Sequence, residues 1–280
     1  MYADISCFDV RKAPLRLERA EGVARLAFRQ RDGATRLATL YQEGCAKIRL
    51  PRPPPGAQPE AILINTAGGL TGGDRLAFEV VAGAASSATI TTQACERIYR
   101  STGEDAVVVN RLTAEAGSRL AWLPQETILF DGGRLVRRLE VDLAEGAQLL
   151  AVEAVLFGRA AMGEVLRSGA LRDRWRVRSN GKLIFADDFR IDGDIAKRLA
   201  APATLGGHRA MATMLAVCPE PEERIETVRD IIGSHGGASA WDGKLVVRLL
   251  AEDSLSLRHR LEPLLSFLLV DRPLPKVWQL

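Results

Sequence analysis

Most of the chain consists of short apolar runs separated by polar turns. Runs rich in Val, Ile, Leu and Thr recur at fairly regular intervals, at 61–64, 88–92, 106–112, 120–123, 135–143 and 148–155. Such runs, bounded by Gly, Asp and Asn, are typical of β-strands. The strands follow one another without intervening helices, which argues against a parallel sheet made of βαβ units.

Two turns predict β-hairpins. Asn180-Gly181 separates two strand-like runs, and Asp242-Gly243 precedes another at 245–250. Both positions of each turn tolerate positive φ, as a two-residue hairpin requires. The turns that contain Gly117 and Gly146 also recur in equivalent places, each closing one strand and opening the next.

Two segments have helical patterns instead, and both lie late in the chain. The segment 219–232 begins with Pro219, carries acidic residues in its first turn and stops at Gly233. The segment 254–270 carries leucines at helical spacing, after a possible N-cap at Asp253 or Ser254. With about fifteen strands, we predict a mostly β single domain over residues 1–280, with two late α-helices. Turn spacing does not choose between a sandwich, a barrel and a coiled solenoid.

The composition indicates a soluble globular protein without a strong electrostatic field. Apolar residues make up 47% and charged residues 26%, and the formal charge of +3 comes from 38 basic and 35 acidic side chains. This near-balance argues against nucleic acid or a membrane surface as a partner. The four cysteines are far apart, and no secretory or membrane-spanning run is present. We therefore expect a cytoplasmic protein whose cysteines are small core residues.

The sequence offers little for catalysis. Its three histidines, His208, His235 and His259, have no second ligand at helical or hairpin spacing, so no tight metal site is predicted. The GxSxG, GxGxxG and GxxxxGK[ST] patterns are absent, which removes the usual nucleophile elbow and nucleotide cradles. We expect no catalytic residue and no permanently bound cofactor.

Three unusual stretches carry candidate functional residues. The first reads NTAGGLTGGD (65–74), where Thr71 and Asp74 can satisfy turn amides or face a channel or partner. In the second, at 91–100, Arg97, Tyr99 and Arg100 are expected to share one strand face suited to a partner. The third reads WLPQETILF (122–130).

A fourth stretch, EAVLFGRAAMGE (153–164), places two carboxylates around an arginine. Glu153 and Arg159 could form a structural ion pair, because a carboxylate in apolar surroundings needs a partner. Alternatively, Glu153 and Glu164 could line a hydrophilic passage that holds a divalent cation briefly. Oxygen ligands alone bind a divalent transition-metal ion weakly, which suits transfer better than storage.

Together with RW at 174–175 and PKVW at 275–278, these stretches resemble the UreD family of urease accessory proteins. The resemblance runs from about Leu37 to the C-terminal end. It implies a body coiled like a β-helix, with two helices, and a non-enzymatic role. It further implies that the chain binds UreF, which recruits the GTPase UreG, and that the assembly docks on apo-urease so that nickel, in transit, enters the enzyme.

The resemblance also suggests roles for individual residues. Asp74, Glu153 and Glu164 are the candidates for a nickel passage, with Arg159 as their counter-charge. The two late helices and Trp278 are candidates for the UreF contact. Thr71, Arg97, Tyr99 and Arg100 are expected to support the passage or a partner contact.

Two alternatives remain at this point. One is an all-β metal-dependent hydrolase that uses Asp74, Glu153 and His208, although the scarcity of histidine argues against it. The other is a purely structural interaction module without a metal path, in which the acidic residues only form ion pairs.

Overall fold

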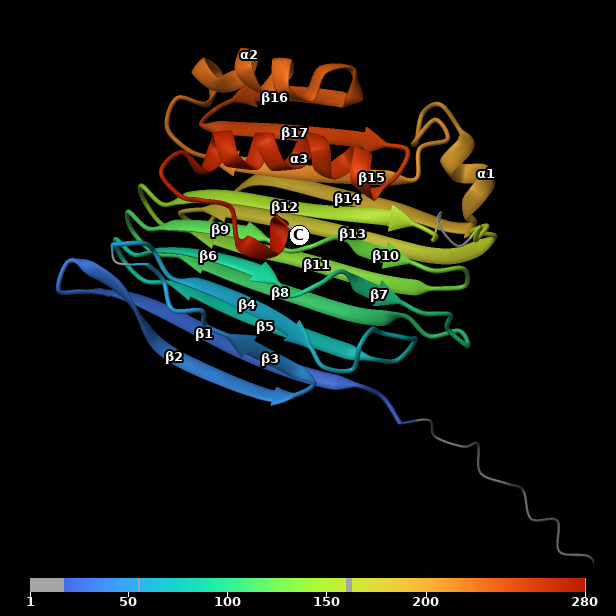
Figure 1. Ribbon diagram of the computed structural model, residues 1–280, viewed down its shortest axis with the longest axis horizontal. Coiled ribbons are helices and arrows are strands. Elements are labelled where there is room, and N and C mark those ends of the chain that lie inside the picture. The colour runs from blue at the N-terminus through green and yellow to red at the C-terminus, as the bar shows by residue number, and fades with distance from the viewer. Residues whose placement is uncertain (1–17, 55, 160–162, 280) are drawn as a thin grey trace, which may run out of the picture.

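The computed structural model describes residues 18–54, 56–159 and 163–279, which form two stacked β-sheets with helices near the end of the stack that the later strands form (Figure 1). The first sheet has seven strands in the order β14-β13-β11-β8-β5-β1-β2. Its strands are β1 (Glu21–Arg31), β2 (Ala34–Gly44), β5 (Arg75–Ala82), β8 (Ala106–Ala114), β11 (Arg134–Leu143), β13 (Ser168–Ser179) and β14 (Lys182–Asp194).

The second sheet has ten strands, with the main order β16-β17-β15-β12-β9-β6-β4-β3 and two short strands beside it. Its strands are β3 (Ala46–Arg49), β4 (Glu60–Asn65), β6 (Ser87–Thr92), β7 (Glu96–Ile98), β9 (Arg119–Leu123), β10 (Thr127–Leu129), β12 (Gln148–Phe157), β15 (Ala210–Val217), β16 (Gly236–Trp241) and β17 (Lys244–Ala251).

The chain coils between the two sheets. It runs from β5 to β6, then from β8 to β9 and from β11 to β12, and equivalent strands of successive coils pair in parallel. Residues 29 or 32 positions apart consequently pair, as Trp122 does with Ala151 on one side and Ile90 on the other. The predicted β-helix-like body is confirmed, and coil turns rather than crossover helices connect its parallel strands.

The predicted turns are confirmed. Asn180 and Gly181 have φ values of 48° and 77° and join β13 to β14 in an antiparallel hairpin. Asp242 and Gly243 do the same for β16 and β17, with φ of 45° and 73°. The turns at Gly117 and Gly146 stack, since the Gly117 N–H donates to the Glu145 carbonyl over 3.0 Å.

Both predicted helices are present. They are α2 (Pro221–Ile232) and α3 (Ser254–Leu269), and Asp253 caps α3 by accepting from the Ser256 N–H over 2.8 Å. A third helix, α1 (Ile195–Ala200), is too short to leave a periodic pattern in the sequence. No helix in the described part of the chain is long and apolar enough to cross a membrane.

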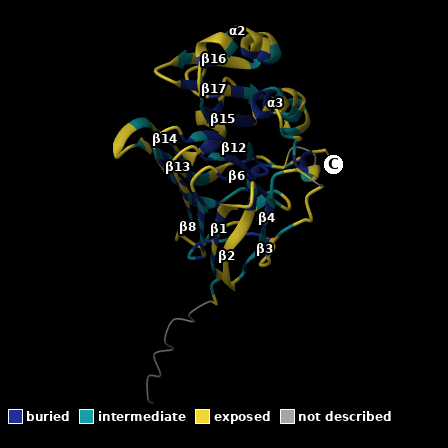
Figure 2. Cartoon of the chain, turned by 90° about the vertical axis from the view of Figure 1, so that its left-hand side faces the viewer, coloured by how far each residue is buried: buried dark blue, intermediate teal, exposed yellow. Residues whose placement is uncertain are grey.

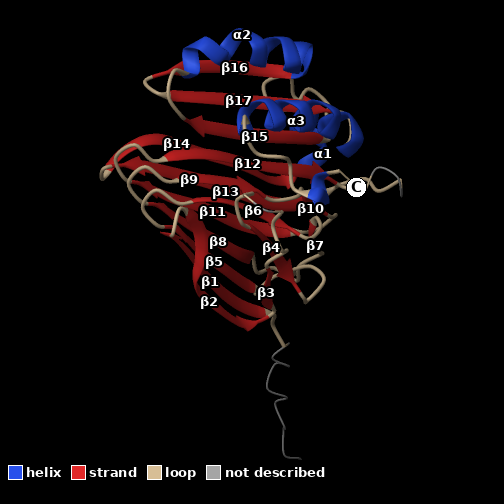
Figure 3. Ribbon diagram, turned by 60° about the vertical axis from the view of Figure 1, so that its left-hand side comes forward, coloured by secondary structure: helices blue, strands red, loops and turns tan. Residues whose placement is uncertain are grey.

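Two separate cores result. One fills the space between the sheets, and the other lies between the second sheet and helices α2 and α3. Figure 2 shows buried positions along the strands and exposed ones over the outer helix surfaces. In Figure 3 the helices gather at the end of the coil formed by the later strands.

Candidate functional site

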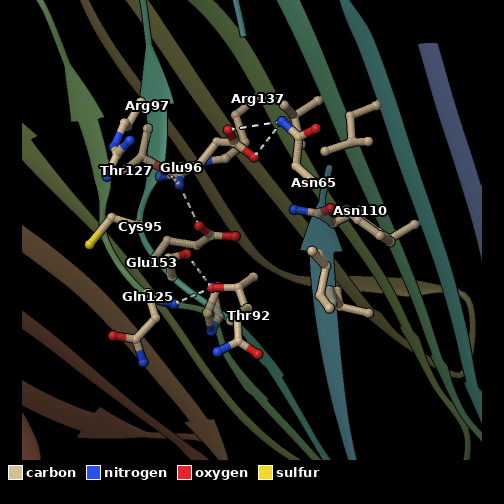
Figure 4. A pocket seen from close by; sticks show the side chains of 18 of the residues that line it. Asn65, Thr92, Cys95, Glu96, Arg97, Asn110, Gln125, Thr127, Arg137 and Glu153 are labelled. Carbon is tan, nitrogen blue, oxygen red and sulfur yellow. Dashed lines mark hydrogen bonds and ion pairs between the residues drawn. The ribbon is translucent and has the colours of Figure 1, made fainter. Parts of the chain in front are cut away.

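A cavity of about 240 Å³ lies between the two sheets (Figure 4). Side-chain alternation along β8 and β11 sends Val108, Asn110, Leu135 and Arg137 into this space. The second sheet closes it with residues of successive coils, namely Leu63, Thr92, Trp122, Thr127 and Glu153. The mouth is marked by the exposed lining residues Gly68, Gln93, Ala94 and Arg97.

A buried charged cluster occupies the inner part of the cavity. The Arg137 Nη1 lies 2.5 Å from Glu153 Oε2, and both side chains are only 3% exposed. Arg137 also donates to both carboxylate oxygens of Asp173, from Nε over 3.1 Å and from Nη2 over 2.6 Å. The Trp122 indole donates to Glu153 Oε1 over 3.0 Å.

The charges in this cluster do not balance. One guanidinium faces two carboxylates, so the ionised cluster carries one negative charge in a site that water solvates poorly. Burial, and then the charge of Asp173, raise the pKa of Glu153, although Arg137 opposes this. Because Asp173 holds Arg137 in a two-pronged contact, we assign the site's affinity for a proton or cation to Glu153.

A second carboxyl, Glu96, lies near the mouth. The Asn65 Nδ2 donates to both of its oxygens, over 3.1 and 3.2 Å. Burial raises the pKa of Glu96 to about 7. The sequence prediction missed Glu96, which lies between Cys95 and Arg97 in a stretch considered only for its basic and aromatic residues. No local pattern marked it, because its partner Asn65 lies 31 residues earlier in the chain.

The thiols are poor candidates for metal ligands. Cys45, Cys95 and Cys218 are free and partly exposed, and Cys7 lies outside the described residues. Burial, together with the Glu126 carboxylate, raises the pKa of Cys95 to about 12. Cys95 therefore stays protonated, whereas metal ions bind the thiolate.

Asp74 is buried but lies outside the cavity lining. Its two oxygens accept from the Ala20 and Thr71 backbone N–H groups, over 2.8 and 2.7 Å. The Thr71 hydroxyl in turn donates to the Arg100 carbonyl over 2.8 Å. Thr71 and Asp74 thus hold the glycine-rich turn.

The other predicted residues gather around Phe130. Tyr99 packs edge-on against this ring at 5.2 Å, and the Arg159 guanidinium lies 4.3 Å from its centre. Arg159 pairs with Glu164 over 3.1 Å. The predicted Glu153–Arg159 ion pair is therefore wrong, and Arg159 is the counter-charge of Glu164 alone among the three predicted acids.

The expected common strand face of Arg97, Tyr99 and Arg100 is also wrong. Strand β7 ends at Ile98, so only Arg97 lies on it, and Arg97 alone of the three lines the cavity. Arg100 instead bridges to the next turn, where its Nη2 lies 2.7 Å from Asp131 Oδ2.

Trp278 is fully buried rather than available at the surface. Its indole donates to the Leu123 carbonyl over 3.0 Å and lies 5.4 Å from the Arg258 guanidinium. Arg258 of α3 pairs with the fully buried Glu126 over 2.7 Å. Trp278 therefore anchors the C-terminal segment, and its indole has no surface to offer a partner.

The residues of the hydrolase alternative do not assemble. Neither Asp74 nor His208 lines the cavity that contains Glu153, and the His208 Nδ1 lies 2.7 Å from the Leu205 carbonyl. Across the described ranges, no three His, Cys, Asp or Glu side chains form a group that could hold a metal ion.

The sequence comparisons place this arrangement in a family. The profile of the UreD urease accessory proteins matches residues 20–279. The chain belongs to the UreD family. The family resemblance of the sequence motifs is thereby confirmed, and the family consists of accessory proteins rather than enzymes.

Individual UreD proteins match over nearly their full length. The chain is 54% identical over 268 residues to urease accessory protein UreD 1 of Brucella ovis, which covers 94% of this chain and 95% of the relative. Identity to UreD of Rhizobium rhizogenes is 52% over 272 residues, or 97% and 99% of the two chains. For UreD of Agrobacterium fabrum it is 48% over 274 residues, or 98% and 96%.

Proposed function

We propose that this UreD protein is a maturation scaffold through which nickel reaches apo-urease, with Glu153 as a ligand on the way. The observation that carries the proposal is the unbalanced cluster of Glu153, Arg137 and Asp173 beside a cavity inside the fold. A structural ion pair needs no such excess of negative charge. A cation in transit would neutralise it.

The donor set suits passage rather than storage. Besides Glu153, the cavity offers the amide oxygen of Asn110, which is buried and has no hydrogen-bond partner among the residues that the structure describes. Oxygen donors without imidazole or thiolate bind nickel weakly, so an ion held by them can leave again. Nickel is thus cargo, and the protein needs no resident cofactor for this role.

The partners follow from the same role. We propose that the chain acts in the cytoplasm with UreF, the GTPase UreG and the apo-urease subunits. Helices α2 and α3 remain the candidate UreF contact, and two exposed apolar side chains at the two ends of α3 support this. Leu255 is 63% exposed and Val270 is 69% exposed.

Asp74 and Glu164 fit a structural role better than a place in the passage. The carboxylate of Asp74 is used by two backbone amides, and that of Glu164 by Arg159. We therefore route the proposed passage through Glu153 and assign these two residues to the turns that they hold.

Deleting and restoring the gene tests the role. We expect cells without this chain to accumulate urease protein that is inactive and poor in nickel, and the restored gene to correct both defects. Fully loaded, active urease in the deletion strain would overturn the proposal. Co-purification of tagged chain with UreF and UreG tests the partners separately, and its failure would leave the scaffold assembly unsupported.

A further inference from the structure

A second, smaller pocket lies on the helix side of the second sheet. Its volume is about 30 Å³, and residues of α2, α3, β9, β12 and β15 line it. Leu150 and Leu268 contribute to it from the core under the helices. Among the described residues, this pocket and the cavity between the sheets have no lining residue in common, so they are separate sites.

Arg272 brings a buried positive charge to this pocket. It lies three residues after the end of α3, and its side chain is 11% exposed. Its Nε and Nη1 atoms are buried and have no hydrogen-bond partner among the residues that the structure describes. Burial, and then the positive charge of Arg119, lower the pKa of Arg272 to about 10, although Asp271 opposes this. The guanidinium is still charged at pH 7, and a buried charge is costly unless it is paired.

The neighbouring acid, Asp271, is held by another arginine. Its two oxygens accept from the Arg119 guanidinium over 3.1 to 3.3 Å. The Arg272 Nε lies 3.9 Å from Asp271 Oδ1, which is too long for a hydrogen bond. One carboxylate thus stands between two guanidinium groups, and Arg119 makes the hydrogen bonds to it.

The other polar side chains that line the pocket can all donate hydrogen bonds. Arg224 of α2 is half-buried and adds a second guanidinium, while Gln148 and Cys218 add an amide and a thiol. Burial raises the pKa of the Cys218 thiol, so its proton stays in place. No acidic side chain lines the pocket within the described part of the chain. Two positive charges and two neutral donors form a lining that selects an anion.

The size of the pocket restricts what the anion can be. A volume of about 30 Å³ has room for about two water molecules, so only a head group of a few atoms fits. A carboxylate is such a group, and its two oxygens match the planar donor fork of arginine. The rest of the ligand must stay outside. Val270, two residues before Arg272, is 69% exposed and offers apolar surface for a larger partner.

We propose that Arg272 and Arg224 anchor one carboxylate side chain of a partner protein that docks on α2 and α3. This inference rests on the partner contact proposed above for these helices. The acidic side chain of the partner enters the pocket, accepts from the two guanidinium groups and supplies the negative charge that Arg272 lacks within its own chain.

Thermal unfolding of the full-length chain in sodium formate tests the pocket without the partner. Formate is a bare carboxylate, and we expect 100 mM of it to raise Tm by about 3 °C over sodium chloride of equal ionic strength. Arg272→Gln should lose this rise. The control Arg229→Gln, which changes an exposed arginine of α2, should respond like wild type. An equal rise with chloride, or a rise that persists in Arg272→Gln, would overturn the carboxylate site.

Calorimetric titration of UreF into the full-length chain tests the partner. Arg272→Gln should weaken binding about 10- to 100-fold. Arg272→Lys, which keeps the charge but not the planar fork, should weaken it less. Formate at 100 mM should weaken the binding of wild type about tenfold and leave that of Arg272→Gln unchanged.

The outcomes separate this anchor from the proposed function. Equal affinity of UreF for wild type and Arg272→Gln would overturn the anchor and leave the UreF contact standing. Formate protection together with that result would assign the pocket to a free carboxylate instead. If wild type itself did not bind UreF, the proposed contact would be refuted, and the formate experiment would still decide whether the pocket takes a carboxylate.

The stability of Arg272→Gln is also decisive. The substitution removes a buried charge that has no hydrogen-bond partner among the described residues. Without formate and without UreF, the variant should therefore melt at or above the wild-type temperature. A lower melting temperature would contradict the premise that Arg272 lacks a counter-charge within the chain.

Discussion

The two cores of the molecule differ in whether their buried charges are balanced. Under helices α2 and α3, Glu126 faces one arginine, Arg258, whose guanidinium donates to both of its oxygens. Trp278 is buried in the same region, and its indole N–H donates to the Leu123 carbonyl. Between the sheets, Arg137 faces two carboxylates, and a cavity of about 240 Å³ remains beside them.

This difference separates stability from function. A matched buried pair fixes how helix α3 sits on the sheet. An unmatched cluster beside a cavity contributes little stability for its size, and local violations of packing and charge rules are expected at functional sites. Substitutions of the charged residues under the helices should therefore mainly lower stability, whereas substitutions of those between the sheets should mainly impair function.

The largest loss of stability is expected from Arg258→Ala. This change leaves the fully buried carboxylate of Glu126 without its partner and should lower the free energy of unfolding by about 3–5 kcal/mol. Urea unfolding measures the loss. The double variant with Glu126→Gln should recover part of it. A single variant as stable as wild type would contradict the structural role of the pair.

A smaller loss is expected from Trp278→Phe. The aromatic packing is largely kept, but the Leu123 carbonyl loses its indole donor. We expect a loss of about 1–2 kcal/mol, measured by the same unfolding experiment. Unchanged stability would mean that the C-terminal segment is not anchored through this residue.

Glu153→Gln should change stability little, by about 1 kcal/mol or less at pH 7, because it relieves the excess charge while Arg137 keeps Asp173. The pKa of Glu153 is raised in the folded state, so its ionisation opposes folding as the pH rises. The variant should accordingly gain stability relative to wild type between pH 6 and pH 8. A loss comparable to that of Arg258→Ala would assign Glu153 to the framework.

Glu96 should make stability depend on pH. Its pKa is about 7 in the fold against an ordinary value of 4.5, so the folded state binds more protons between these values. The stability that Glu96 contributes to the fold is therefore fully present below pH 4.5 and is lost as the pH rises through 7. When the free energy of unfolding is plotted against pH across this window, wild type and Glu96→Gln should differ in slope. Parallel curves would indicate that the carboxyl ionises normally.

The smallest effect belongs to the exposed outer face of the first sheet. Arg111 there contacts both Glu79 and Glu140, over 3.4 and 3.2 Å, and all three side chains are solvent-accessible. Glu140→Gln should cost less than about 1 kcal/mol. A larger loss would show that the contacts of Arg111 with Glu79 and Glu140 contribute more to stability than isolated surface ion pairs do.

The strands, both hairpins and the two long helices could be predicted because they depend on local pattern, such as the Asn180-Gly181 turn. The ion pair of Glu153 could not, because its partner Arg137 lies on β11 of the facing sheet, and the arginine nearest in sequence, Arg159, pairs with Glu164 instead. This pair joins the two sheets across the cavity, so it depends on which strands face each other and not on a local pattern in the sequence.

The most direct test of the passage is the nickel content of urease from cells that carry Glu153→Gln in place of the wild-type chain. Amounts of chain and of its complex with UreF are matched, and Glu140→Gln serves as the control. We predict assembled complexes and abundant urease that is poor in nickel only with Glu153→Gln. Normal nickel content with this variant would contradict the claim that the buried carboxylate lies on the path of the metal.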